Sequence, residues 1–215
     1  MYTLYATLGS GNCFKPFLAM RQLSIPFRTV AVDVLSGQTR QEAFLKINGA
    51  GSVPYLLTSE GVGVGESNAM LWLVADGSPL MPASALERAQ SLQWMFFEQS
   101  KLEPFISPAR FFTAIVPERG IGREEEIAAW RERAKAGLAV LDGHLASNEF
   151  MVGGRYGITD IALYGYVHVA GEAAIDMKAF PSVERWMRAV SATPGYVSLR
   201  QLCADATPFI SKDAA

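Results

Sequence analysis

Three polar residues near the N-terminus have side chains that could take part in chemistry. Ser10, Asn12 and Cys13 lie in the stretch LGSGNCFK (8–15), which joins a strand-like segment to the start of an expected helix. A helix N-terminus stabilises nearby negative charge through its free N–H groups and its dipole. Three interpretations are open: Cys13 is a nucleophile with a lowered pKa, Ser10 donates a hydrogen bond to a ligand anion, or all three residues only cap the helix.

The Val53–Pro54 step and the Glu66–Ser67 pair are a second group of candidate ligand-binding positions. If the X–Pro bond is cis, the N–H and C=O of Val53 point outward, where a peptide ligand can pair with them. A proline that simply begins a strand is the alternative. Ser67 is expected to be a helix N-cap and thus part of an anion site, with a carboxylate beside it that can pair with a cation. This arrangement suits the zwitterionic end of an amino acid, whereas the simpler alternative is helix capping alone.

Gly61, Gly63 and Gly65 form a G-x-G-x-G pattern that superficially resembles a dinucleotide-binding loop. Such a loop follows the first strand and begins a helix, whereas these glycines fall within a strand-like segment. The Glu66 carboxylate at the next helix start would also repel phosphate. We therefore expect these three glycines to lie in a turn and a strand, where they let another backbone approach.

Cysteine and histidine usage is sparse. Cys13 and Cys203 are far apart, no CxxC occurs, and the only histidines are His144 and His168. This excludes a zinc site that is evident from sequence, argues against a disulfide scaffold and predicts a reduced, cytoplasmic protein. Neither histidine has an evident acid partner, and His168, within YGYVHVA, is expected to be a core residue with a local partner.

The bulk composition is that of a globular protein with a large core. Of 215 residues, 50% are apolar and 19% are charged, and the net charge is −2. No Lys/Arg run favours nucleic acid or an anionic membrane surface. We also expect no signal peptide after Met1 and no membrane helix, because no uncharged apolar run approaches the required length of about 18 residues.

Periodicity in the first part of the chain predicts a small α/β domain over residues 1–77 with a four-stranded mixed sheet. Pro16 is expected in the first turn of the first helix, and Thr39 and Glu42 are expected to form a capping box. The expected elements, in the order βαβαββα, are a strand at 2–6, a helix at 12–23, a strand at 25–34, a helix through 47, strands at 54–58 and 61–65, and a helix at 68–77.

After a Gly/Ser/Pro-rich linker near residues 76–84, the strand signals stop, which predicts an all-helical bundle over 84–215. Ser84 and Glu87 form an expected capping box. The expected helices are 86–105, an amphipathic helix at 123–147, an almost wholly apolar helix at 157–170, and a helix from 181 that breaks at Pro194–Gly195. The aromatic residues Trp94, Phe96, Phe97, Phe111 and Phe112 are expected to be mostly core.

In the order and spacing of these motifs, the chain resembles the cytosolic glutathione S-transferases over essentially its full length. The stretches that carry the resemblance are GSGNCFK, LKINGAGSVPYL, GESNAMLWLVA, GGRYGITDIALYGYVHVA and FPSVERWMRAVSATPGYV. The resemblance implies a thioredoxin-like N-terminal domain, an all-α C-terminal domain and a homodimer. It also implies glutathione as co-substrate, with no metal.

The resemblance assigns roles at the thiol and peptide ends of glutathione. Ser10 falls where serine-type members, such as the theta and delta classes, place the hydroxyl that bonds the glutathione sulfur. Asn12 matches an asparagine near that sulfur in nu-type bacterial members, and Cys13 matches a common non-catalytic cysteine. The resemblance also implies that Val53, with Pro54, contacts the cysteinyl backbone of glutathione.

Glu66 and Ser67 match the positions that hold the γ-glutamyl end. The chain departs from the family at Ser52, where many relatives have a basic residue, so the contact of Ser52 with the glycyl carboxylate is expected either to be weaker or to be supplied elsewhere, by Arg40. Asn48-Gly49 replaces a common Asn-Pro. The buried helix begins with Gly157 in place of Ser/Thr, although Asp160 is retained.

The resemblance therefore implies a glutathione transferase of the detoxification type that activates the thiol for attack on a small hydrophobic electrophile. The second-substrate pocket is expected near Leu102, Phe105, Arg110 and Phe111, by analogy with the fold. Two alternatives are a glutathione-dependent disulfide reductase or peroxidase, for which Asn12 is the hint, and a non-catalytic binding protein.

Overall fold

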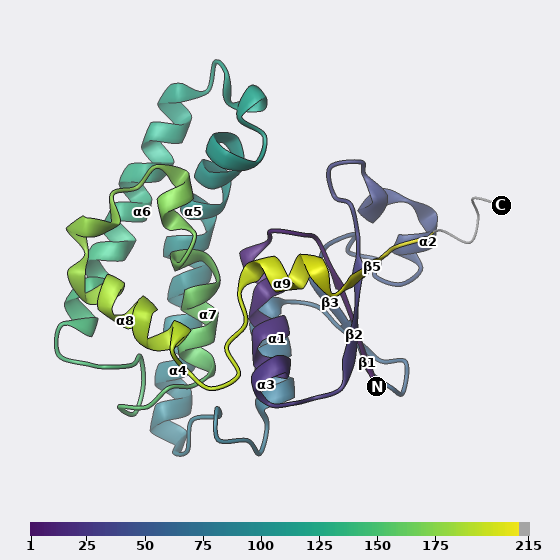
Figure 1. Ribbon diagram of the computed structural model, residues 1–215, viewed down its shortest axis with the longest axis horizontal. Helices are drawn as coiled ribbons and strands as arrows, with labels where there is room; N and C mark the ends of the chain where they lie inside the picture. Colours follow the sequence, from purple (N-terminus) through teal and green to yellow (C-terminus); the bar gives the residue numbers. More distant parts are fainter. Residues whose placement is uncertain (211–215) are drawn as a thin grey trace. The chain divides into compact units, whose positions relative to one another are not determined.

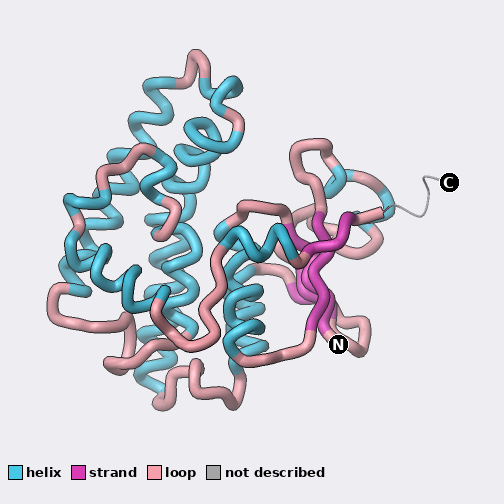
Figure 2. Tube along the Cα trace, in the orientation of Figure 1, coloured by secondary structure: helices cyan, strands magenta, loops and turns pink. Residues whose placement is uncertain are grey.

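The computed structural model describes residues 1–210. The chain divides into two compact units, one made of Met1–Ser78 with the described residues from Pro194 onward, the other of Pro79–Thr193 (Figures 1 and 2). This division differs from the predicted boundaries in that the last segment joins the first unit. The reason is that it supplies a strand and a short helix there, whereas the prediction assigned it to the helical bundle. Residues 211–215 of the predicted second domain lie outside the described residues.

The first unit has the predicted βαβαββα order. Its elements are β1 (Tyr2–Ala6), α1 (Gly11–Gln22), β2 (Phe27–Ala31), the 3-10 turn η1 (Gln38–Arg40), α2 (Glu42–Leu45), β3 (Tyr55–Leu57), β4 (Gly63–Val64), α3 (Ser67–Ala75), α9 (Leu199–Ala204) and β5 (Ala206–Pro208).

The sheet has five strands in the order β4-β3-β1-β2-β5, not the four predicted. β1 pairs in parallel with β2 and antiparallel with β3, and β5 adds in parallel to β2. The sequence signal for β5 is weak because the strand is three residues long and contains Pro208, which fits only an edge strand or an irregular one.

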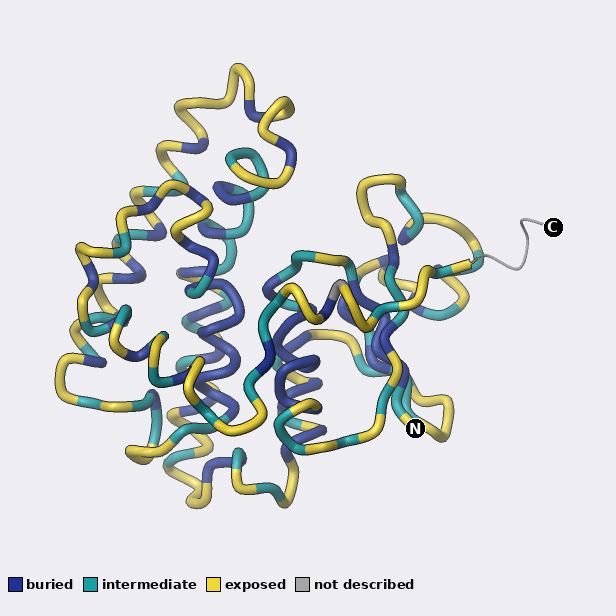
Figure 3. Tube along the Cα trace, in the orientation of Figure 1, coloured by how far each residue is buried: buried dark blue, intermediate teal, exposed yellow. Residues whose placement is uncertain are grey.

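Apolar side chains alternate between the two faces of the sheet, as the period of a strand requires. Leu4 is fully buried, as are most of the apolar residues of α1, which lies with α3 on one face (Figures 1 and 3). On the other face, Tyr5, Val32 and Phe44 of α2 form a second cluster. The mixed sheet is thus covered on both faces within this unit.

Two predicted helix starts in the first unit are wrong in detail. α1 begins at Gly11, so Pro16 lies in its second turn and not in its first. Thr39 is buried in η1, and the N-cap of α2 is Gln41, with no side-chain capping bond. The Thr39–Glu42 capping box is therefore absent, and α2 is only one turn long.

Gly63 has a specific steric role in β4. A Cβ at this position would lie 1.6 Å from the Tyr55 hydroxyl oxygen, so the Tyr55 side chain crosses the strand where Gly63 leaves room. The prediction of a close approach here is right, but the approaching group is a side chain and not a backbone.

The second unit is all-helical. Its elements are α4 (Ala85–Phe97), the π-helical segment η2 (Glu98–Leu102), α5 (Glu103–Arg110), the π-helical segment η3 (Phe111–Ile115), the 3-10 turn η4 (Pro117–Gly120), α6 (Glu124–Leu145), α7 (Ile158–Val167), the 3-10 turns η5 (Ala170–Ala173) and η6 (Met177–Ala179), and α8 (Pro181–Ser191).

The capping box at the start of α4 is confirmed. The Glu87 N–H donates to Ser84 Oγ at 3.1 Å, and the Glu87 carboxylate accepts from the Ser84 N–H at 3.1 Å. The aromatic residues predicted to be mostly core are not fully buried: Phe96 has 70% of its surface exposed, and Trp94, Phe97, Phe111 and Phe112 are half-buried. No helix within residues 1–210 combines the length and the apolarity needed to cross a bilayer.

The predicted central helix is confirmed, because every residue of α7 is buried (Figure 3). Its N-terminus is closed by the Asp160 carboxylate, which accepts hydrogen bonds from the N–H groups of Gly157 at 3.0 Å and Met151 at 2.9 Å. The Trp186 indole donates a third, at 2.8 Å. Burial raises the pKa of Asp160 to about 6, opposed by these hydrogen bonds.

Candidate functional site

Ser10 caps the N-terminus of α1. Its backbone is extended, and Ser10 Oγ accepts a hydrogen bond from the Cys13 N–H at 3.3 Å. This bond uses a lone pair of the hydroxyl, so the hydroxyl hydrogen can still be donated, either to the neighbouring Cys13 thiol or to a ligand. The side chain is half-buried, so a ligand can reach it. Capping and donation to a ligand are therefore compatible at Ser10.

Cys13 is not placed as a nucleophile. Its side chain is fully buried, and the sulfur accepts a hydrogen bond from the Thr7 N–H at 3.4 Å. Burial raises the pKa of the thiol to about 11, and the hydrogen bonds from Ser10 and Thr7 oppose this only in part. Because the thiolate is the reactive form, Cys13 is inert near neutral pH.

The start of α3 lies beside the start of α1. Ser67 is buried, and its hydroxyl donates to Asn12 Oδ1 at 3.2 Å across 55 residues of sequence. Ser67 is the first helical residue and not the predicted N-cap, a position that belongs to Glu66. Glu66 is exposed, with a left-handed φ of 63° that is unusual for a non-glycine residue. The structure thus brings Asn12 and Ser67 together, with the Glu66 carboxylate next in the chain.

The Val53–Pro54 bond is cis. Val53 is half-buried against the Tyr5, Val32 and Phe44 cluster, and no hydrogen bond among the described residues uses its N–H or C=O. In the antiparallel β1–β3 pair, Tyr5 is opposite Tyr55. Val53, two residues before Tyr55, therefore lies at the same end of the sheet as the segment that leads from β1 to Ser10. These backbone groups can pair with an extended peptide.

Arg40 supplies a cation close to the segment that precedes Val53. A Cβ on Gly51, whose φ is 60°, would lie 2.9 Å from Arg40 Nη1, so the guanidinium lies against the Gly51 backbone. Ser52 is exposed, and its carbonyl accepts from Asn48 Nδ2 at 2.8 Å. Ser52 itself carries no positive charge, but the Arg40 guanidinium supplies one beside its neighbour Gly51.

The predicted second-substrate residues belong to the helical unit, and they differ in surroundings. Leu102 is fully buried and packs close to Gly137 of α6, so contact with a substrate would require it to move. Phe105 and Phe111 are half-buried, and the Arg133 guanidinium lies 5.3 Å from the Phe105 ring centre.

Arg110, the fourth of these residues, is buried in an ion pair. Arg110 Nε lies 2.7 Å from Glu172 Oε2, and the Glu172 side chain is half-exposed. No local pattern relates the two residues, which are 62 positions apart, so sequence patterns could not predict this partner. The pair explains how an arginine is held buried at the end of α5.

His168 is a core residue, as predicted. Its Nδ1 lies 2.6 Å from the Tyr164 carbonyl oxygen, and its ring stacks on the Tyr164 ring at 4.6 Å. Burial lowers the pKa of His168 to about 4, partly opposed by the hydrogen bond to Tyr164. The imidazole is neutral at pH 7.

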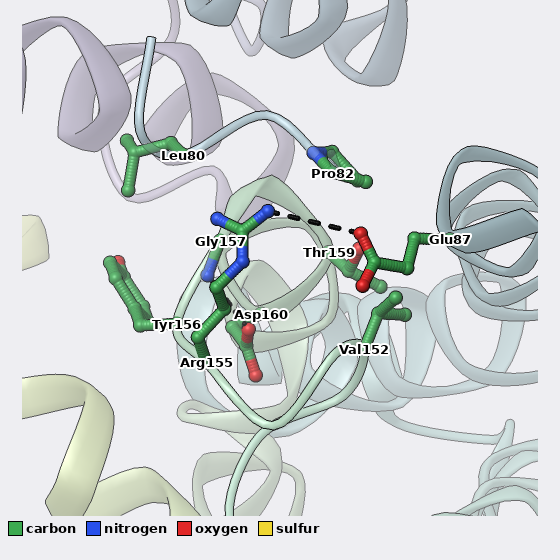
Figure 4. Close-up of a pocket in the computed structure, with 9 residues that line it drawn as sticks. All are labelled: Leu80, Pro82, Glu87, Val152, Arg155, Tyr156, Gly157, Thr159 and Asp160. Atoms are coloured by element: carbon green, nitrogen blue, oxygen red, sulfur yellow. Dashed lines mark hydrogen bonds and ion pairs between the residues drawn. The ribbon is translucent and has the colours of Figure 1, made fainter. Parts of the chain in front are cut away.

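A small cavity near the linker has a structural role. Arg155 spans it, donating to the carbonyls of Pro79 at 2.8 Å and Met81 at 3.0 Å and lying 3.9 Å from the Glu87 carboxylate (Figure 4). The cavity measures about 10 Å³, near the lower limit for a single water molecule. It is too small for a substrate, and Arg155 fixes the linker to the helical unit.

Comparisons with known proteins agree with this architecture. The glutathione S-transferase N-terminal and C-terminal domain models match residues 9–76 and 124–189. A crystal structure of a possible glutathione S-transferase from Rhodopseudomonas palustris is 42% identical, with a TM-score of 0.90, over 96% of this chain and 99% of that one.

Two curated relatives show how varied the similar proteins are. Elongation factor 1-gamma of Artemia salina is 30% identical over 85% of this chain and 42% of its own length. The disulfide-bond oxidoreductase YfcG of Escherichia coli is 25% identical over 85% of this chain and 87% of its own. The chain spans about half the length of the elongation factors that it matches.

The two domain matches cover most of the chain and fall one in each compact unit, where the sheet and the helical bundle were found. The expected thioredoxin-like unit and all-helical unit are both confirmed, and the chain belongs to the glutathione S-transferase family.

Proposed function

We propose that the protein is a glutathione transferase that binds glutathione on the sheet-containing unit and holds its thiol as a thiolate. The observation that carries the proposal is the hydrogen bond from Ser67 to Asn12, which joins the starts of α3 and α1. Both helices direct their positive ends to this place. One ligand with an anionic group at each of two points can therefore use both.

Each part of glutathione has a matching group. The α-carboxylate of its γ-glutamyl end would accept from the Ser67 region, and its ammonium would pair with Glu66. The cysteinyl backbone would pair with Val53. Arg40 would attract the glycyl carboxylate, with Ser52 beside it.

Ser10 would donate its hydroxyl hydrogen to the glutathione sulfur. A thiol with an ordinary pKa of about 8.5 needs a reduction of one to two units to ionise near neutral pH, equivalent to about 1.4 to 2.7 kcal/mol. One charge-assisted hydrogen bond and a helix N-terminus supply energies of this size. Ser10 is then a donor to the thiolate and not a nucleophile or a base.

The reaction that follows is attack of the thiolate on a small hydrophobic electrophile. With an aryl halide, a carbon–sulfur bond forms, the carbon–halogen bond breaks, and the halide leaves with the bonding electrons. The thiol proton passes to solvent when glutathione binds. Phe105, Phe111, Arg110 and Leu102 are the proposed contacts for this substrate, and the fully buried Leu102 would have to move to reach it.

A glutathione-dependent disulfide reductase or peroxidase is the second candidate, and Asn12 favours it. Its amide lies at the start of α1, next to the proposed sulfur position, and a relative named as a disulfide-bond oxidoreductase is similar over 85% of this chain. In this reaction the thiolate would attack a disulfide sulfur and release the other sulfur as a thiolate. A non-catalytic binding protein is the third candidate, because a fold alone does not ensure catalysis.

The experiment that separates these candidates uses Ser10→Ala, Asn12→Ala and Cys13→Ala. Glutathione binding is measured by calorimetry, and turnover is measured with an aryl halide and with a small disulfide. The transferase proposal predicts that Ser10→Ala loses aryl halide turnover most and that Cys13→Ala stays near wild type. Loss of activity only in Cys13→Ala would overturn the assignment of Ser10, and wild-type protein that binds no glutathione would overturn both enzymatic candidates.

We also propose a cytoplasmic homodimer with a detoxification role, as the family resemblance implies. Leu92 and Phe96 are exposed apolar side chains four residues apart on α4, and neighbouring exposed apolar residues support association. Light scattering of the wild type and of Phe96→Lys tests the dimer: the proposal predicts a loss of mass in the variant.

A further inference from the structure

β5 lies near the C-terminus and pairs with the sheet formed by the N-terminal part of the chain. It pairs with β2 so that Thr29 is opposite Ala206 and Ala31 is opposite Pro208. The Phe209 N–H donates to the Ala31 carbonyl at 2.8 Å. β5 thus occupies the edge of β2, which would otherwise present unpaired backbone groups to solvent.

β5 delivers the Phe209 side chain to the face of the sheet that carries α2. The ring of Phe209 meets Phe44 edge to face at 5.8 Å and Tyr5 at 6.5 Å between ring centres. Tyr5 and Phe44 meet in the same way at 6.0 Å. Three aromatic rings from β1, α2 and the end of β5 therefore form one mutually packed group, and Figure 1 shows the yellow C-terminal segment passing along β2 toward α2.

Val53 packs against the same group. It is one of the half-buried apolar residues in contact with the Tyr5, Val32 and Phe44 cluster, as are Ile47 and Phe209. A change in how Phe44 is held thus reaches Val53 through the cluster that both belong to or pack against. It also reaches Arg40, since η1 adjoins α2 and lies against Gly51.

α2 depends on this packing more than other helices of the unit do. It has four residues and no side-chain capping bond. An isolated helix of this length is unstable in water, so its position is set by the burial of its apolar side chain, Phe44. Phe209 supplies one side of that burial from the far end of the sequence.

We propose that Phe209 is a positioning residue for the peptide-binding segment around Val53, so that the C-terminal strand acts as a strap for α2. This proposal rests on the proposed function in one respect, because the ligand whose affinity it affects is glutathione. Phe209 packs against Tyr5 and Phe44 on the face of the sheet opposite to α1, so its effect is on binding and not on activation of the thiol.

Three full-length variants test the strap: Phe209→Ala, Phe209→Leu and, as matched control, Ile210→Ala. Ile210 is the next residue and has 79% of its surface exposed. The first measurement is amide hydrogen exchange without ligand. We expect faster exchange in residues 42–53 of Phe209→Ala than in wild type, a smaller change in Phe209→Leu, no change in Ile210→Ala, and no change in α1 or α3 in any variant.

The second measurement is the Kd for glutathione together with the pKa of the bound thiol. Coupling through packing of this kind alters affinity by about 2- to 30-fold, so we expect a rise in Kd within that range for Phe209→Ala, with the thiol pKa unchanged. Ile210→Ala should match wild type in both.

The two measurements distinguish failure of this proposal from failure of the proposed function. Exchange that stays unchanged at 42–53, or that rises equally throughout the sheet-containing unit, overturns the strap. Wild-type protein that binds no glutathione overturns the proposed function, and the exchange measurement then decides the strap alone. Equal Kd values for Phe209→Ala and Ile210→Ala, in a protein that does bind glutathione, also overturn it.

Discussion

The N-termini of α1 and α7 share the same backbone chemistry and differ in what satisfies it. At α7, the Asp160 carboxylate is built into the chain, is buried, and accepts three N–H groups. At α1, Ser10 accepts only one N–H group and remains half-buried, with no acidic residue in the first turn. A helix start that carries its own anion stabilises the fold, whereas one without an anion can receive it from a ligand.

Asp160→Ala should produce the largest effect at the closed helix start. Three buried N–H donors lose their acceptor, so we expect the free energy of unfolding to fall by about 3 to 5 kcal/mol. Urea denaturation measures this change. Asp142→Ala is the matched control, because Asp142 accepts only one such bond, from the Val183 N–H, and should cost about 1 kcal/mol. Equal costs for the two variants would contradict the account of α7.

His168, at the other end of α7, should make stability depend on pH. Burial lowers its folded-state pKa from 6.5 to about 4, so protonation favours the unfolded chain and stability falls as pH drops through this window. We expect the stability advantage of wild type over His168→Phe to shrink by about 2 kcal/mol between pH 7 and pH 5.

Denaturation of both proteins at each pH gives this difference. Asp160, whose folded-state pKa is raised, shifts stability in the opposite direction, but it is present in both proteins and cancels. A difference that is constant with pH would show that His168 is not held neutral.

Ser67→Ala tests whether the start of α3, like the start of α1, takes part in binding glutathione. Loss of the hydroxyl removes the bond to Asn12 that joins the starts of α3 and α1, both proposed to hold the ligand, so the Kd for glutathione should rise about tenfold, equivalent to 1.4 kcal/mol. Calorimetry measures the change. Ser191→Ala, whose hydroxyl bonds only within its own helix, serves as control and should leave the Kd unaltered.

Cys13→Ala should have the smallest effect on activity. Because the thiol is buried and its pKa is raised to about 11, we expect turnover within about twofold of wild type, whatever the modest cost in packing. Steady-state kinetics with either substrate class gives the answer. A tenfold loss would place Cys13, and not the ligand, as the reacting thiol.

Local sequence patterns predicted most of the helices and strands around the N-termini of α1 and α7. The apolar run of α7, the Ser84–Glu87 box and the βαβαββα order follow from periodicity and capping residues, and all are confirmed. Ser10 also occupies a helix start that its residue type predicts. Such features depend on neighbours within a few positions, which the sequence displays directly.

Features that depend on distant residues were not predicted. Ser67 and Asn12, Arg110 and Glu172, and Phe209 with Phe44 are each joined only by tertiary packing. β5 was missed because a strand of three residues with a proline carries little periodic signal. Thr39 and Glu42 had the spacing of a capping box, but burial of Thr39 in a 3-10 turn overrode that local preference.

The pKa of the thiol of bound glutathione, titrated in wild type, Ser10→Thr and Ser10→Ala, shows whether the Ser10 hydroxyl holds that thiol as a thiolate. We predict a pKa one to two units below the ordinary value of about 8.5 in wild type and in Ser10→Thr, and a return of most of that shift in Ser10→Ala. A thiol pKa that is the same in Ser10→Ala as in wild type would contradict the account, because the open start of α1 would then not depend on its Ser10 hydroxyl.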